Sequence, residues 1–140
     1  MLAGRYGTAI HGHPAVEKRL TDTGPFSLIE PGGATQLPGG ARALPIGRPR
    51  RYEMPLWLPS HAALVFGDAI VEVGGELRVW VQDPPGDKRR RFVRERFAPT
   101  FAPLLELGAE RILVTHGEPV LANGTAELTR ALEREPFWHW

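Results

Sequence analysis

The stretch LWLPSHAALVFGD, residues 56–68, decides the fold of this 140-residue chain. An apolar segment comes first, a turn follows at Pro59-Ser60-His61, and a second apolar segment runs into Gly67-Asp68. Two apolar segments separated by a short turn predict a β-hairpin. Because both segments are almost continuously apolar, we expect strands that are covered on both faces, within a layered α/β fold.

A second stretch, RILVTHG at residues 111–117, follows the same plan. Its apolar part predicts a short buried strand, and His116 follows that strand as Asp68 follows the hairpin. Sheets of α/β proteins place their functional groups at the carboxyl ends of strands. Carboxylate and imidazole are ligand types that suit Zn²⁺ or iron. Asp68 and His116 are therefore the two candidate metal ligands.

The rest of the chain predicts further strands, a second hairpin and three helices. The second hairpin is centred on Gly74-Gly75, because paired glycines supply the positive φ that a tight turn requires. Pro99 and Pro103 are expected to break the middle helix. The expected elements are strands at 8–11, 26–29 and 43–46, the hairpin at 69–81, and helices at 15–20, 88–97 (resuming over 104–107) and 125–134.

Composition indicates a single globular domain over residues 1–140. Hydrophobic residues make up 42% of the chain and charged residues 24%, which is typical of a folded protein. A net charge of +1 gives no reason to expect a nucleic-acid partner. No apolar run approaches the roughly 18 residues of a spanning helix, and no signal peptide is recognised. We therefore expect a cytoplasmic protein that binds neither nucleic acid nor membranes.

Residues 56–68 and 111–117 together resemble the metallo-β-lactamase-fold hydrolase superfamily. The first stretch is similar to that family's hairpin ending in Gly-Asp, whose aspartate bridges two metal ions. The second is similar to the strand whose histidine completes the second metal site, although Thr115 stands where the family has glycine. The resemblance implies an α/β fold, part of a metallo-β-lactamase-like αββα sandwich with a mixed sheet and flanking helices. By order of elements it covers residues 5–134.

The other metal ligands of that family have no counterpart in this sequence. The main motif has two histidines one residue apart, followed by Asp-His. The nearest string is His11-Gly12-His13-Pro14, which runs on into Ala15-Val16. The third ligand falls within residues 47–51, GRPRR, where histidine is replaced by arginine or proline. We therefore predict a truncated, degenerate member that comprises the C-terminal part of the fold and lacks the N-terminal histidine-motif portion.

Two readings of Asp68 and His116 stay open at this point. They are either surviving metal ligands or residues kept for structure, where they satisfy nearby backbone groups. A zinc site needs three or four protein ligands, so these two do not make one by themselves. No cofactor is expected unless other residues complete the site, in which case it would hold Zn or Fe. His11 and His13 have the spacing of ligands on one strand face but no third partner nearby.

Arg48, Arg50 and Arg51 form a candidate anion site. Where intact relatives hold a cation, this chain presents fixed positive charge that suits a carboxylate or phosphate. The alternative is a solvated loop. The basic run over residues 88–96 predicts the charged face of an amphipathic helix. The aromatic tail, residues 137–140, is expected to pack over the edge of the domain or on a partner subunit.

The predicted function is that of a degenerate metallo-β-lactamase-fold protein, without an intact binuclear centre, that binds a small anion or acts as an interaction module. The alternative is a metal-dependent hydrolase of an ester, thioester, lactam or phosphoester. Its missing ligands would come from an upstream segment or a partner chain. A homo-oligomer is also expected, because a shortened sandwich leaves a sheet face that needs a cover.

Overall fold

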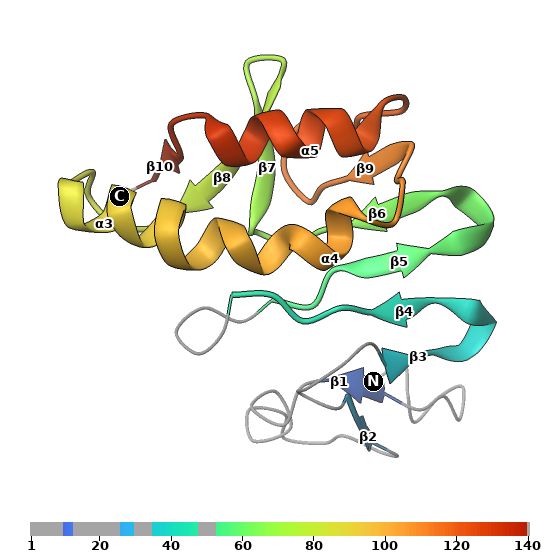
Figure 1. The fold of residues 1–140 in the computed structure, drawn as a ribbon. Helices are drawn as coiled ribbons and strands as arrows, with labels where there is room; N and C mark the ends of the chain where they lie inside the picture. Colours follow the sequence, from blue (N-terminus) through green and yellow to red (C-terminus); the bar gives the residue numbers. More distant parts are fainter. Residues whose placement is uncertain (1–9, 13–25, 30–34, 48–52, 140) are drawn as a thin grey trace.

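The computed structural model describes residues 10–12, 26–29, 35–47 and 53–139, which form ten strands and three α-helices (Figure 1). The strands are β1 (Ile10–Gly12), β2 (Phe26–Leu28), β3 (Thr35–Gln36), β4 (Arg42–Ala43), β5 (Leu56–Leu58), β6 (Ala63–Val65), β7 (Ile70–Val73), β8 (Glu76–Val81), β9 (Arg111–Leu113) and β10 (Phe137–Trp138). The helices are α3 (Asp87–Phe92), α4 (Ala102–Leu105) and α5 (Gly124–Glu133). Short 3-10 turns occupy Pro38–Gly40, Pro59–His61 and Ala98–Phe101.

A five-stranded mixed sheet has the order β3-β4-β5-β6-β9. Its first four strands are antiparallel neighbours, and β5 and β6 form the hairpin predicted from residues 56–68. Strand β9 joins this hairpin from far along the chain and runs parallel to β6. Strand β4 is shorter than expected, because beyond Ala43 only Ile46 makes a bridge, to Glu53.

A second mixed sheet has the order β10-β8-β7. Strands β7 and β8 form the predicted hairpin around Gly74 and Gly75, both of which have positive φ. The aromatic tail supplies β10, which pairs in parallel with β8 and covers its edge. Packing of the tail over the edge of the domain is thus confirmed. Strands β1 and β2 form a separate parallel pair. Two mixed sheets with helices confirm the predicted α/β class.

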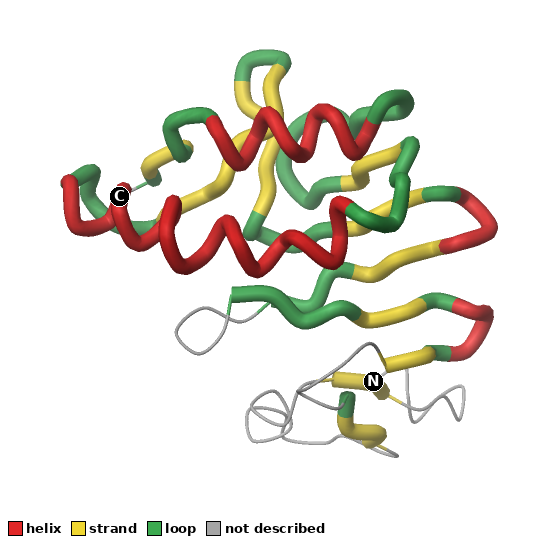
Figure 2. Tube along the Cα trace, viewed as in Figure 1, coloured by secondary structure: helices red, strands yellow, loops and turns green. Residues whose placement is uncertain are grey.

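The helical region over residues 87–105 forms one nearly continuous run of helix (Figure 2). Its hydrogen-bonding pattern changes along its length. Helix α3 gives way to a π-helical turn at Val93–Phe97, in which Ala98 donates its N–H to the carbonyl of Val93. Proline at position 99 has no N–H to donate, so the regular α pattern cannot continue through it. A 3-10 turn then leads into α4. The predicted break is confirmed, and it takes the form of a change in helix type.

One apolar core unites both sheets with the helices. Phe66, Phe97 and Phe101 are fully buried, and the ring of Phe101 lies 5.2 Å from that of Phe97 and 6.0 Å from that of Phe66. The same cluster includes Leu64 from the five-stranded sheet and Val79 from the other. Burial of these side chains is the main force that holds the layers together.

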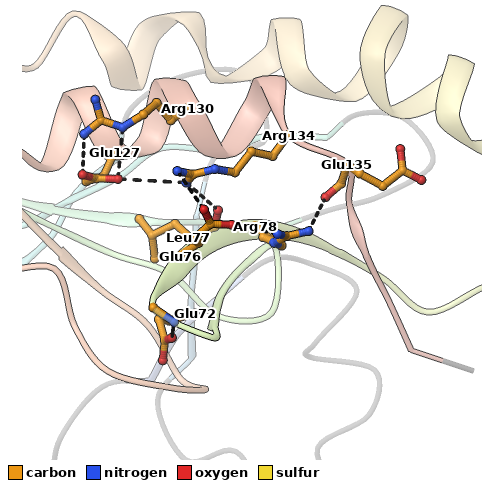
Figure 3. Close-up of polar contacts among 9 residues, drawn as sticks. Glu72, Glu76, Leu77, Arg78, Glu127, Arg130, Arg134 and Glu135 are labelled. Carbon is orange, nitrogen blue, oxygen red and sulfur yellow. Dashed lines mark hydrogen bonds and ion pairs between the residues drawn. The ribbon is translucent and has the colours of Figure 1, made fainter.

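Charged contacts fasten helix α5 to strand β8 (Figure 3). Arg134 forms an ion pair of 3.4 Å with Glu76 and donates to the carbonyl of Leu77. Within the helix, Arg130 is paired with Glu127. Each such partly exposed pair contributes little to the free energy of unfolding.

Several sequence predictions fall outside the described residues: the helix at 15–20, His13, and the three arginines at 48, 50 and 51. None of the helices in the described part of the chain has the length and apolar character needed to cross a membrane.

Candidate functional site

The topology of the five-stranded sheet brings Asp68 and His116 to one place. Strands β6 and β9 are parallel neighbours in a register that pairs Val65 with Leu113. Asp68 lies three residues beyond Val65, and His116 lies three residues beyond Leu113. Residues that lie the same number of positions beyond a paired position of two parallel strands reach the same edge of the sheet. The two residues predicted as a site are therefore neighbours in space.

The two side chains are in contact at the surface. His116 Nε2 lies 3.4 Å from Asp68 Oδ1, and the side chains are 60% and 59% exposed. The hydroxyl of Thr115 donates to the same Asp68 oxygen at 3.2 Å. Thr115, which departs from the family pattern, therefore orients the carboxylate. The result is an open carboxylate–imidazole pair that solvent and ligands can reach.

Glu53 holds the turn that carries Asp68, and sequence reasoning missed it. Its Oε1 accepts a hydrogen bond of 2.9 Å from Gly67 N, and its Oε2 accepts one of 2.5 Å from Ala69 N. These two N–H groups flank Asp68 on either side. A carboxylate that accepts two backbone hydrogen bonds makes a strong, directional clamp. The one signal in the sequence is an acidic residue between a basic cluster and an apolar strand, which is common in proteins.

Glu72 holds the loop that carries His116 in a similar way. Its backbone N–H donates to the carbonyl of His116 at 3.0 Å, and its carboxylate accepts from Glu118 N at 2.8 Å and Gly75 N at 2.5 Å. The hydrogen bond from Glu118, followed by that from Gly75, lowers the pKa of the Glu72 carboxyl. Both members of the pair are thus positioned by a glutamate from a neighbouring segment.

Replacing Glu72 with glutamine will destabilise the protein in a pH-dependent manner. The lowered pKa means that the folded state favours the ionised carboxylate, so its contribution is present above the unfolded-state pKa and is lost as the pH falls through the folded-state pKa. We expect the melting temperature of E72Q to lie below that of the parent at pH 7 and to converge with it in acid. Thermal melts across the pH range measure this. The control is E106Q, at an exposed glutamate whose side chain makes no hydrogen bond or ion pair within the described part of the chain. A difference in melting temperature between E72Q and the parent that does not depend on pH would contradict the assignment.

Trp80 lies beside the Asp68–His116 pair, on the side of His116. Its ring makes edge-on contact with that of His116 at 5.5 Å and with that of His139 at 5.7 Å. Its Nε1 is buried and has no acceptor among the described residues. An indole N–H in that state is costly, because its desolvation is not offset by a hydrogen bond.

The three predicted arginines lie outside the described residues, but the described residues on either side of them are hydrogen-bonded to the rest of the protein. At one end Gly47 N donates to Thr100 Oγ1 at 3.0 Å. At the other, Glu53 bridges Ile46 and clamps the Asp68 turn. His11, by contrast, is exposed on β1, where it is paired with Ser27.

The spacing of Asp68 and His116 suits two ligands of one metal ion. Ligand bonds of about 2.0–2.1 Å at a tetrahedral angle place two donor atoms about 3.3 Å apart, and the observed distance is 3.4 Å. The number of donors falls short, because within residues 10–12, 26–29, 35–47 and 53–139 no three or more ligand-type side chains gather. The pair fits as part of a metal site and would need further ligands from elsewhere.

A cavity of about 620 Å³ adjoins the Asp68 turn. It lies between that turn, the end of strand β8 and helix α3. Its lining is mixed, with apolar and charged side chains in similar measure: Glu53, Gly67, Asp68, Trp80, Val81, Gln82, Asp83, Lys88, Arg89, Phe92 and Val93. Clefts of this size commonly take small molecules.

Comparison with known proteins identifies the fold. No family model matches the sequence, and no curated protein matches it. The solved chemotaxis sensor ODP, described as a peroxy diiron species, is similar over 93% of this chain and 61% of its own, with a TM-score of 0.63 and 14% identity. The DIM-1 metallo-β-lactamase exposed to ceftazidime is similar over 94% of this chain and 59% of its own, with a TM-score of 0.57 and 13% identity.

This chain thus spans about six-tenths of the length of those two solved structures. Sequence identities of 14% and 13% show a similarity of fold alone. The chain has the metallo-β-lactamase fold.

Proposed function

We propose that this chain is a small-anion-binding module, without a binuclear metal centre of its own. The observation that supports this is the Glu53 clamp, which fastens the end of the arginine-bearing segment to the Asp68 turn. Arg51 is two residues from Glu53, and chain geometry limits that separation to about 7 Å. The chain itself thereby keeps Arg51 near the turn that carries Asp68.

The charges near this turn favour an anion. Arg48, Arg50 and Arg51 bring three positive charges within five residues of Glu53 in the sequence, against the two carboxylates of Glu53 and Asp68. Both carboxylates are already hydrogen-bonded within the protein. The planar guanidinium group binds carboxylate or phosphate through two parallel hydrogen bonds. Inorganic phosphate is therefore the simplest probe of the site.

A charge-matched pair of triple variants tests the proposal. We expect phosphate to raise the melting temperature of the parent protein, because a ligand that binds only the folded state stabilises it. R48Q/R50Q/R51Q should lose most of this shift. R91Q/R94Q/R96Q removes the same charge from exposed positions around helix α3 and should keep it. Equal phosphate shifts in the two variants would refute a site at Arg48, Arg50 and Arg51.

A metal-dependent hydrolase is the second candidate, favoured by the 3.4 Å spacing of Asp68 and His116. These two residues would hold the ion, which would supply a water activated at neutral pH for attack on an ester, thioester, lactam or phosphoester. A preceding segment or a partner chain in a homo-oligomer would complete the ligand set. Titrating the same samples with Zn²⁺ separates the candidates, since tight binding of two equivalents would favour the hydrolase and reject the anion module.

A further inference from the structure

We infer that the side chain of His139 positions the imidazole of His116 through the ring of Trp80. His139 is thus a positioning residue for the Asp68–His116 pair. The inference goes beyond the proposed anion site and does not depend on it. It is carried by three rings in a row, which join the aromatic tail to the candidate site.

The rings of His139, Trp80 and His116 are in contact one after the other. The centroid of the Trp80 ring lies 5.7 Å from that of His139 and 5.5 Å from that of His116. The interplanar angles are 82° and 78°, so both contacts are edge-on, an arrangement that aromatic rings prefer. Trp80 is therefore the shared neighbour of both imidazoles.

The ring of Trp80 keeps an orientation that its N–H does not favour. Trp80 Nε1 is buried and has no acceptor among the described residues, which costs free energy. Contacts elsewhere on the ring must outweigh this cost to hold the observed orientation. The edge-on contact with His139 is one of them.

The backbone of the tail is held independently of the His139 side chain. Strand β10 pairs in parallel with β8, beside which it lies in Figure 1, and His139 N donates to the carbonyl of Val81 at 3.0 Å. Trp138 Nε1 donates to Glu135 Oε1 at 2.9 Å, and Arg90 Nε donates to the same oxygen at 2.7 Å. Changing the side chain of His139 therefore removes its ring and leaves these bonds of the strand in place.

The contact of His116 with Asp68 is too weak to fix the imidazole alone. The His116 side chain is 60% exposed, and its Nε2 lies 3.4 Å from Asp68 Oδ1. Exposed ion pairs contribute little, and this one is charged only when the imidazole is protonated. The ring of Trp80 is the second support of this imidazole. The orientation of Trp80 therefore sets that of His116, and any ligand that reaches the pair meets an imidazole placed in this way.

H139L and H139F test this inference. H139L fills a similar space without a ring, whereas H139F keeps a ring that can make the same edge-on contact. The readout is the intensity of the nuclear Overhauser cross-peaks between the ring protons of His116 and Trp80, at one fixed pH and with neither phosphate nor metal present. We expect H139L to weaken these cross-peaks about two- to tenfold, because the loss of one aromatic contact lowers the population of the observed orientation by that factor. H139F should retain them.

The matched control is H61L, at an exposed histidine of the Pro59–His61 turn that makes no ring contact within the described part of the chain. It should leave the cross-peaks at the intensity of the parent. The inference is overturned if H139L also leaves them unchanged, even with a lowered melting temperature, because His139 would then only stabilise the edge of the sheet. It is overturned as well if H139F loses the cross-peaks as H139L does. Since phosphate is absent, a failure here is distinct from a failure of the site at Arg48, Arg50 and Arg51.

Discussion

Replacing Gly117 with alanine lowers the free energy of unfolding by about 2–5 kcal/mol, which is a large part of the stability of a single domain. Gly117 has φ +88°, a conformation that alanine resists. A Cβ at this position would also lie 2.5 Å from the carbonyl oxygen of Glu72 and 2.7 Å from its Cβ. Backbone cannot move aside cheaply, so the loop carrying His116 must shift. Denaturation with urea measures the loss.

Gly75 provides the control that separates the cost of a positive φ from the cost of a steric clash with Glu72. Its φ is +86°, nearly that of Gly117, but a Cβ there would meet nothing within 4 Å. G75A should therefore cost only the conformational part, about 1–2 kcal/mol. If G117A lost no more free energy of unfolding than G75A, the close approach of Gly117 to Glu72 would be wrong. Our account of how His116 is held would then be wrong as well.

Replacing Phe101 with alanine is expected to cost about 3–5 kcal/mol. This side chain is fully buried between Phe66 and Phe97, with ring centroids at 6.0 and 5.2 Å. Removing it leaves a void that rigid neighbours on a strand end and a π-helical turn fill poorly. The measurement is again the free energy of unfolding in urea, with far-ultraviolet circular dichroism to follow the transition.

Leu121 is the reference for this truncation. It is the large hydrophobic side chain that stands out as exposed among the described residues, at 64%. L121A should change stability by no more than about 0.5 kcal/mol. Similar losses in F101A and L121A would contradict the position of Phe101 in the core.

Much of the fold could be predicted because local patterns agree with it. The apolar segments around Pro59-Ser60-His61 predicted the β5–β6 hairpin, and Gly74-Gly75 predicted the β7–β8 hairpin. Pro99 predicted the break in the helical region. Each of these signals acts over a few residues, where side-chain polarity and backbone freedom decide the local conformation. Strand β10 carried no such signal, because its pairing with β8 depends on residues far away in sequence.

The candidate site was predictable in its two central residues and not in their supports. Asp68 and His116 were recognised because each follows a buried strand, and the structure places them 3.4 Å apart. Glu53 and Glu72 were missed. A glutamate that accepts hydrogen bonds from a distant backbone looks, in sequence, like any surface glutamate.

By itself, the sequence determined the class of fold, the hairpins and the two ligand-type residues, because these depend on local polarity and on motifs a few residues long. Only the tertiary structure decided that Asp68 and His116 meet, since that requires the parallel register of β6 and β9, which are separated by more than 40 residues. It also decided which groups hold the two residues in place. Glu53 accepts hydrogen bonds from Gly67 and Ala69 beside Asp68, and Glu72 accepts one from Glu118 beside His116.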